Sequence, residues 1–216
     1  MNLWPNCPSL LIFILFFAVT IQLKLSMKRI VIFASGSGSN AENIIKHFQN
    51  SSIARVTNVL SNNEYAKVFD RCKRLKISAK HFNRQDFIKE DTILKFLLKE
   101  ADYIILAGFL WKVPSKIVDA FPNKIINVHP ALLPKYGGKG MYGMHVHKAV
   151  KENNEEESGI TIHYVNEHYD EGNIIFQAKT ILSKEDSPET IAEKIHELEY
   201  AFFPKVIENV ILDNGE

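Results

Sequence analysis

The sequence predicts an α/β protein with a doubly wound, mostly parallel sheet and an antiparallel addition near the C-terminus. Three observations support this prediction. Short apolar runs rich in β-branched residues alternate with helical patterns from residue 27 onward. The first run ends in a glycine-rich loop that leads into a helix, as in many open α/β sheets. The last third of the chain holds two strand-like runs joined by a polar turn, which is typical of antiparallel pairing.

Composition describes an ordinary globular protein. The chain has 216 residues, of which 46% are hydrophobic and 24% charged, and a formal net charge of +1. Its 26 basic and 25 acidic residues are nearly balanced, which argues against a broad cationic surface for nucleic acid. The two cysteines, Cys7 and Cys72, form no CxxC motif, and such usage suits a reducing compartment such as the cytoplasm.

The first 26 residues form an apolar leader that interrupts this picture. Residues 10–19 are an uninterrupted apolar run, and the first charge is Lys24. A signal peptide would need a basic start, and a membrane anchor would need ~20 apolar residues, more than this leader offers. We therefore predict that the fold begins at Met27 and that residues 27–216 form one domain, and we do not expect membrane attachment.

The order of elements follows from the two periodicities. Apolar, β-rich runs predict strands at residues 29–34, 54–60, 79–82, 103–107, 124–129, 159–165 and 174–180. Helical spacing predicts helices at residues 41–48, 66–75, 86–100, 115–120 and 144–153. Ser187 and Pro188 open a last, long helix, in which Pro204 should produce a bend or a division. Four glycines between residues 137 and 143 predict a loop.

The loop after the first strand has the composition of an anion site. Small side chains let backbone N–H groups approach a ligand, and the helix that follows adds a partial positive charge at its N-terminus. A phosphate is the expected ligand, although a simple Gly/Ser turn remains an alternative, because the loop lacks the lysine of a Walker A motif. The candidate residues are Gly36, Ser37, Gly38, Ser39 and Asn40.

Two polar side chains emerge where another apolar strand stops. Asn127 and His129 are two residues apart and so share a face, and Pro130 then ends the strand. An amide can donate to a developing oxyanion, while an imidazole exchanges protons near neutral pH. No Ser or Cys lies beside His129, so an attacking group would come from a substrate. The alternative is a capped strand end with a satisfied histidine.

Five segments together resemble the phosphoribosylglycinamide formyltransferase family, over the chain from Met27 to about Leu212. They are FASGSGSN at 33–40, LAGF at 106–109, INVHPALLPKY at 126–136, YDEG at 169–172 and IIFQA at 174–178. The combination of N-x-H-P-x-L-L-P with a later D-x-G is specific for folate formyl-transfer domains. The glycine loop favours the branch whose substrate is a phosphorylated ribose.

The resemblance implies roles for individual residues. The catalytic trio would be Asn127, His129 and Asp170, and the glycine loop would hold the substrate's phosphate. Glu199 would contact the ribose, and Arg84 would be a basic substrate contact. The folate-binding residues would be Leu110, Trp111, Lys112, Val113 and Asn127. This chain has Leu110-Trp111 where many relatives have Met-Arg. Its second glycine-rich loop, at residues 137–143, is longer than the corresponding loop of many relatives.

The resemblance also implies a reaction and its partners. The amine of glycinamide ribonucleotide would attack the formyl carbon of 10-formyltetrahydrofolate, a cosubstrate, and no metal would be required. Asn127 and a protonated His129 would donate to the oxyanion, and Asp170 would stabilise the imidazolium. His145 and His147 lack the neighbouring ligands of a metal site. The expected assembly is a monomer or weak homodimer.

Two alternatives remain beside this reading. Another folate formyl-transfer enzyme or a deformylase would share the same trio, but each should add a further domain that we do not expect here. A non-catalytic module would keep the phosphate loop and lose the trio.

Overall fold

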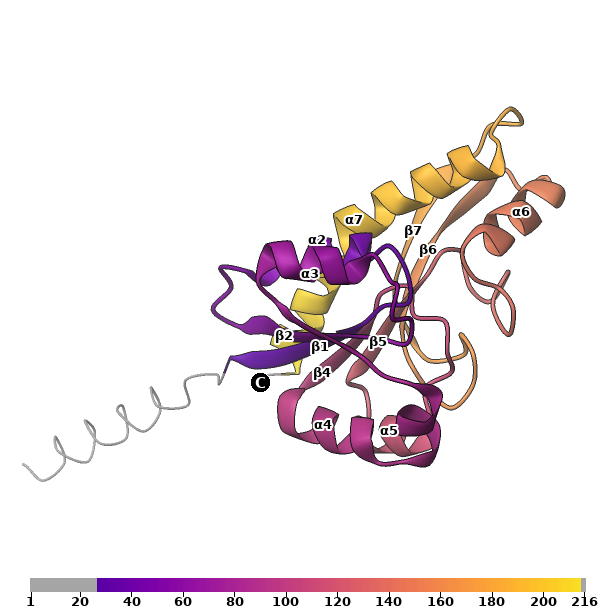
Figure 1. Cartoon of the computed structure of the whole chain (residues 1–216). Helices are drawn as coiled ribbons and strands as arrows, with labels where there is room; N and C mark the ends of the chain where they lie inside the picture. Colours follow the sequence, from indigo (N-terminus) through magenta and orange to yellow (C-terminus); the bar gives the residue numbers. More distant parts are fainter. Residues whose placement is uncertain (1–26, 215–216) are drawn as a thin grey trace, which may run out of the picture.

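The computed structural model describes residues 27–214, which form a sheet covered by helices on both faces (Figure 1). The predicted leader, residues 1–26, lies outside the described residues. Within the described range, no helix is both long and apolar enough to cross a membrane.

The seven strands lie in the order β3-β2-β1-β4-β5-β6-β7. The first five run parallel, β6 is antiparallel to β5, and β7 is antiparallel to β6, so the predicted fold class is confirmed. The chain winds outward from β1 in both directions, which makes the gap beyond the ends of β1 and β4 a topological switch point. The strands are β1 (Lys28–Phe33), β2 (Ala54–Ser61), β3 (Ser78–His81), β4 (Tyr103–Leu106), β5 (Ile125–His129), β6 (Glu157–Tyr164) and β7 (Ile174–Ile181).

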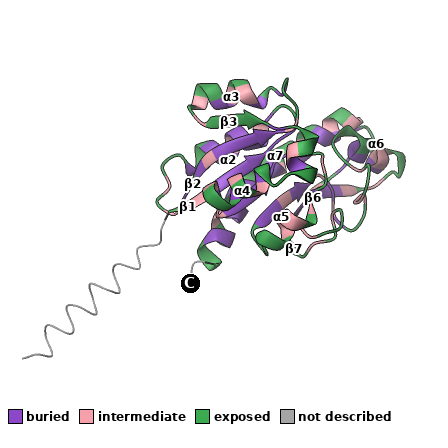
Figure 2. Cartoon of the chain, turned by 60° about the horizontal axis from the view of Figure 1, so that its bottom comes forward, coloured by how far each residue is buried: buried purple, intermediate pink, exposed green. Residues whose placement is uncertain are grey.

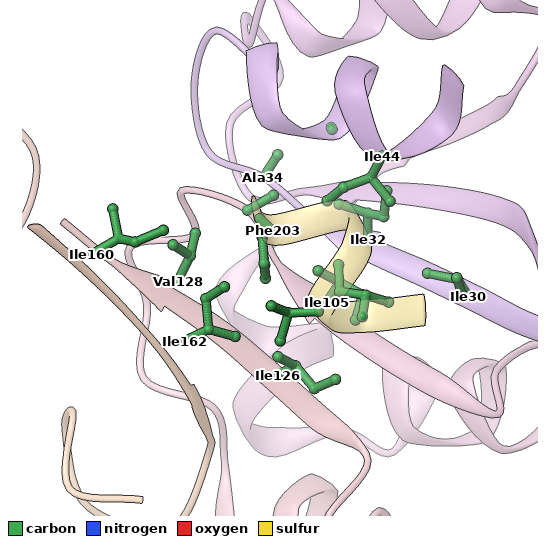
Figure 3. Close-up of a cluster of buried hydrophobic side chains, with 14 of the residues drawn as sticks. Ile30, Ile32, Ala34, Ile44, Ile105, Ile126, Val128, Ile160, Ile162 and Phe203 are labelled. Atoms are coloured by element: carbon green, nitrogen blue, oxygen red, sulfur yellow. The ribbon is translucent and has the colours of Figure 1, made fainter. Parts of the chain in front are cut away.

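Each face of the sheet has its own hydrophobic core. Alternate residues of β1 point to opposite sides: Ile30 and Ile32 join one core, Val31 and Phe33 the other. The first core, part of which is shown in Figure 3, packs under α2 (Ser39–Phe48), α3 (Val68–Leu75), α6 (Met144–Glu152) and α7 (Pro188–Asp213). The second packs against η1 (Gln85–Lys89), α4 (Thr92–Glu100) and α5 (Ser115–Ala120). Because both faces are covered, the central strands are almost wholly buried (Figure 2).

The single helix expected at residues 86–100 is wrong, because the chain breaks near Glu90. The short η1 segment closes with a bond from the Glu90 N–H to the Gln85 carbonyl, after which Glu90 is extended and α4 starts at Thr92. Lys116 of α5 stabilises the break, since its ammonium donates to the Glu90 carbonyl and to Asp91 Oδ1. This tertiary contact is invisible to a periodicity argument.

Pro204 does not divide the last helix, contrary to one of the two outcomes expected for it. The helix runs unbroken from Pro188 to Asp213. A proline has no N–H for the carbonyl four residues earlier, here that of Tyr200. Asn43 of α2 supplies the missing donor, since its Nδ2 lies 3.0 Å from the Tyr200 oxygen. The same contact ties α2 to α7 beside the candidate site.

Candidate active site

A cavity of about 670 Å³ opens at the switch point. Its walls bring together the glycine loop, the 107–110 segment after β4, the end of β5, the 138–144 loop and one face of α7. Asn127, His129, Asp170 and Glu199 all line it, as do the five predicted loop residues from Gly36 to Asn40. Segments distant in the sequence therefore form one site.

The glycine loop is held from behind. Gly38, at φ +73, precedes α2, and among the described residues no side chain caps the first turn. No capping side chain therefore competes with a ligand for the N–H groups at this helix end. Arg71 of α3 donates from Nε to the Ser37 carbonyl at 2.7 Å and also pairs with the buried Glu42. Hydrogen bonds from Lys46, then from Arg71 and Arg74, lower the pKa of Glu42 to about 2. The loop is thus braced by a permanently charged cluster.

Asn127 is oriented by a histidine that sequence reasoning did not single out. His163 of β6 is the cross-strand partner of Asn127, and its Nε2 lies 3.0 Å from Asn127 Nδ2. The other ring nitrogen of His163 donates to the Tyr164 carbonyl at 2.8 Å. Burial lowers the pKa of His163 and keeps it neutral, so Nε2 accepts from the amide. One N–H of Asn127 is used in this way, which leaves the other for a ligand.

His129 is buried, with 3% of its surface exposed, and each ring nitrogen lies near an oxygen atom. Nε2 donates to the Tyr136 carbonyl at 2.7 Å, and Nδ1 lies 3.5 Å from Asp170 Oδ2. Burial lowers the pKa of His129, and the Asp170 charge and the Tyr136 carbonyl oppose this only in part. The neutral ring therefore carries its proton on Nε2 and presents Nδ1 as a base.

Asp170 lies in the β6–β7 connection at a positive φ of 56°. Its Oδ2 accepts from the Gly138 N–H at 2.9 Å, which links it to the glycine-rich 138–144 loop. Its Oδ1 is 3.7 Å from His163 Nε2. The carboxylate thus faces both buried histidines, and the electrostatic attraction raises the pKa of each against the effect of burial.

Glu199 of α7 lies beside the start of α2. Its Oε2 accepts from Asn40 Nδ2 at 2.7 Å and pairs with His196 Nδ1 at 2.8 Å. This hydrogen bond raises the pKa of His196, which favours its charged form at the edge of the cavity. Asn40 Oδ1 is buried without a partner within the described residues, as is Nδ1 of the cavity residue His147. Such orphaned atoms suit a polar ligand.

Only part of the predicted folate segment reaches the cavity. Leu110 lines it together with Phe109, but Trp111, Lys112 and Val113 do not, and neither does Arg84. Val113 is buried in the second core, and Lys112 lies over the ring of Tyr169. Trp111 packs against Phe82, Phe87 and Phe109, and the Arg84 guanidinium stacks on it at 5.7 Å. The roles of these four residues stay predictions.

Sequence reasoning missed four residues that complete the site. Three are histidines, at positions 147, 163 and 196, and the fourth is Tyr136, whose carbonyl holds His129. The alternation of the polar residues Thr161 and His163 along a predicted strand was a signal for His163, and His147 was considered from the sequence only as a metal ligand. Among residues 27–214, no group of three or more His, Cys, Asp or Glu is arranged to hold a metal ion. The arrangement can bind an anion, donate to an oxyanion and move a proton.

Comparison with known proteins gives this geometry a family. The sequence model of the family described as Formyl transferase matches residues 28–207. The chain belongs to this family. The formyltransferase chain is 37% identical over 187 residues to the phosphoribosylglycinamide formyltransferase of Haemophilus influenzae, covering 84% of this chain and 86% of that protein.

One further relative and one solved structure are also similar to this formyltransferase. It is 36% identical over 195 residues to the chloroplastic phosphoribosylglycinamide formyltransferase of Arabidopsis thaliana, and the match covers 83% of this chain and 64% of that protein. It thus spans less than two thirds of the length of the plant relative. The crystal structure of phosphoribosylglycinamide formyltransferase from Anaplasma phagocytophilum superposes with a TM-score of 0.78 at 30% identity, covering 87% of this chain and 89% of that one.

Proposed function

We propose that this formyltransferase transfers the formyl group of 10-formyltetrahydrofolate to the amine of glycinamide ribonucleotide. The products are formylglycinamide ribonucleotide and tetrahydrofolate, and the pathway is de novo purine biosynthesis. One observation carries the proposal: a single cavity contains both an anion-binding loop and the Asn127, His129 and Asp170 side chains. His129 bonds to no hydroxyl or thiol among the described residues, as expected when the substrate brings the nucleophile.

Binding would use the two ends of the cavity. The N–H groups of the glycine loop would hold the phosphate, and Glu199 would accept from the ribose hydroxyls with Asn40 beside it. Phe109 and Leu110 offer an apolar wall for the folate ring. Ser35 couples the two ends, since its hydroxyl accepts from the Leu110 N–H at 3.0 Å. Holding both substrates in one site makes the amine's attack effectively unimolecular.

The free N–H of Asn127 would donate to the oxyanion as the amine attacks. The sequence led us to expect a protonated His129, but burial favours the neutral ring, so we assign it a base role first. Nδ1 would take the proton that the attacking amine releases. The resulting imidazolium would face Asp170 through Nδ1–H and Tyr136 through Nε2–H, and would then return a proton to the departing folate nitrogen.

The proposal extends to partners and place of action. We propose two small-molecule substrates and no nucleic acid, a monomer or weak homodimer, and the cytoplasm as the compartment. The low cysteine content supports the cytoplasm as the compartment. Cys72 is a buried free thiol, and burial raises its pKa to about 11, which makes it unreactive.

The deciding experiment mixes the purified full chain with glycinamide ribonucleotide and 10-formyltetrahydrofolate. We expect formylated ribonucleotide and tetrahydrofolate in equal amounts. Tetrahydrofolate release without any acceptor would instead indicate a deformylase, and binding of the ribonucleotide without turnover would indicate a non-catalytic module.

The leader offers a separate prediction. We propose that residues 27–216 form the working domain, since the described residues already supply a seven-stranded sheet, with β1 starting at Lys28, and two hydrophobic cores. A chain that begins at Met27 should match the full chain in turnover and in thermal midpoint. A large loss in either measurement would show that residues 1–26 are part of the fold.

The phosphate site is tested best at Gly36. A Cβ at Gly36 would have no atom of the described residues within 4 Å, whereas one at Gly38 would lie 2.4 Å from Val68 Cγ2. Gly36→Ala should therefore leave the thermal midpoint unchanged but weaken binding of the ribonucleotide, because the new methyl group enters the space of the ligand. Calorimetric titration with each substrate measures this; equal weakening of both would argue against a phosphate site. Gly38→Ala is the contrasting variant. It should lower the thermal midpoint, because its new Cβ would clash with Val68.

A further inference from the structure

Thr161 is a buried polar residue that the mechanism above does not use. It lies on β6 directly opposite His129, with none of its surface exposed. Its hydroxyl makes three hydrogen bonds: it donates to the Ala131 carbonyl at 2.7 Å, and accepts from the Leu133 N–H at 2.9 Å and from Gln177 Nε2 at 2.8 Å. One donor and two lone pairs are the full capacity of a hydroxyl.

These bonds fix the chain just after the catalytic strand. The segment 131–136 leaves β5 at His129 and turns back, so that the Tyr136 carbonyl meets His129 Nε2 at 2.7 Å. Gln177 of β7 adds a second anchor, because its Nε2 also donates to the Leu133 carbonyl at 3.1 Å. The position of the Tyr136 carbonyl therefore depends on the hydrogen bonds that Thr161 and Gln177 make to the backbone of Ala131 and Leu133.

We propose that Thr161 is a positioning residue for His129, which acts by holding the 131–136 segment so that the Tyr136 carbonyl binds Nε2. The proposal rests on the proposed function, in which His129 accepts a proton at Nδ1. Rotation of the ring or a change of tautomer would break the bond from Nε2–H to Tyr136, so this bond keeps Nδ1 directed at the cavity side shared with Asp170.

The parallel with Asn127 strengthens this inference. On β5 the two functional residues point to one face, and each has a polar cross-strand partner on β6: His163 opposite Asn127 and Thr161 opposite His129. His163 orients its partner directly. Thr161 orients its own through the backbone that follows it. The antiparallel strand thus supports both functional side chains.

The pKa of His129 is the readout that separates positioning from mere packing. The charged or titratable groups around His129 are Asp170 of the β6–β7 connection, His163 of β6, His147 of α6 and Glu199 of α7. None is bonded to Thr161. The Tyr136 carbonyl raises the pKa of His129, so loss of that contact lowers it further while these neighbours stay in place.

The experiment compares Thr161→Val, which keeps the shape and removes the hydroxyl, with Thr161→Ser, which keeps the hydroxyl. Thr161→Val is expected to lower kcat by about 10- to 10²-fold, as small misplacements of a catalytic group do, with the KM of both substrates unchanged. Imidazole NMR titration of the ligand-free chain should show a lower His129 pKa in Thr161→Val. Thr161→Ser should restore both values.

A matched control is Thr57→Val. The Thr57 hydroxyl also bonds to backbone, since it shares its single proton between the Ile30 and Glu100 carbonyls at 3.3 and 3.2 Å, but it lies away from the cavity lining. It should cost stability and leave kcat and the His129 pKa unchanged. Parental kcat and His129 pKa in Thr161→Val overturn the proposal, as does a Ser variant as impaired as the Val variant.

Two further outcomes are also decisive. If Thr161→Val lacks a native thermal transition, Gln177→Met removes only the outer anchor and should shift the His129 pKa in the same direction; no shift overturns the proposal. If the parent chain shows no formyl transfer, the proposed function fails by itself, and the titration alone decides the role of Thr161.

Discussion

Replacing Asp170 with Asn is expected to lower turnover by at least ~10²-fold, the range typical of lost acid–base assistance, while the fold stays intact. Asn tolerates the left-handed conformation of this residue and keeps an oxygen for the Gly138 N–H. It carries no charge, however. The imidazolium formed on His129 during proton transfer would then lack its anion, and the intermediate would rise in energy.

Asp170→Asn should also change how the stability of the fold depends on pH. Asp170 raises the pKa of both His129 and His163, so Asp170→Asn should lower both. Both histidines have a lower pKa in the folded chain than in the unfolded chain, where a histidine has a pKa of about 6.5. Below that pH the unfolded chain therefore binds more protons than the folded chain, and acidification destabilises the fold. The stability of the variant should match the parent's above that pH and fall further than the parent's on acidification.

Turnover against pH, thermal midpoint and imidazole titration of both proteins check this prediction. Glu171→Gln is the control, because it removes an exposed neighbouring carboxylate that does not line the cavity. An Asp170→Asn enzyme with the parent's rate and histidine pKa values would show that Asp170 is only a turn residue.

Asn127→Ala is expected to lower kcat by ~10²–10³, as removal of other oxyanion donors does. The amide is held by His163 at 3.0 Å, so its geometry is set before any substrate arrives. Its free N–H would gain strength only as charge develops on the formyl oxygen. The KM of both substrates should therefore change little.

Asn58→Ala provides the comparison for Asn127→Ala. Asn58 is a buried amide on β2 that does not line the cavity, and its loss should affect stability alone. Steady-state kcat and thermal midpoints separate the two variants. Near-parental turnover in Asn127→Ala would mean that this residue merely ends its strand.

Local patterns in the sequence predict the α/β alternation, the glycine-rich loop after β1 and the polar pair at the end of β5. Each depends on neighbours along the chain, because side-chain period, glycine content and the strand-ending proline act within a few residues. The resemblance added Asp170 and Glu199, which no local pattern would have distinguished from ordinary turn or helix residues.

Tertiary structure alone decided which groups meet across long sequence separations. Asn40 and Glu199, 159 residues apart, share a hydrogen bond, and Asn127 and His163 pair only because β6 runs antiparallel to β5. Packing also directed Trp111 and Val113 away from the cavity. The same holds for the protonation state of His129. Its neutral ring follows from burial and from the Tyr136 carbonyl, and desolvation is a property of the assembled fold that no stretch of sequence contains.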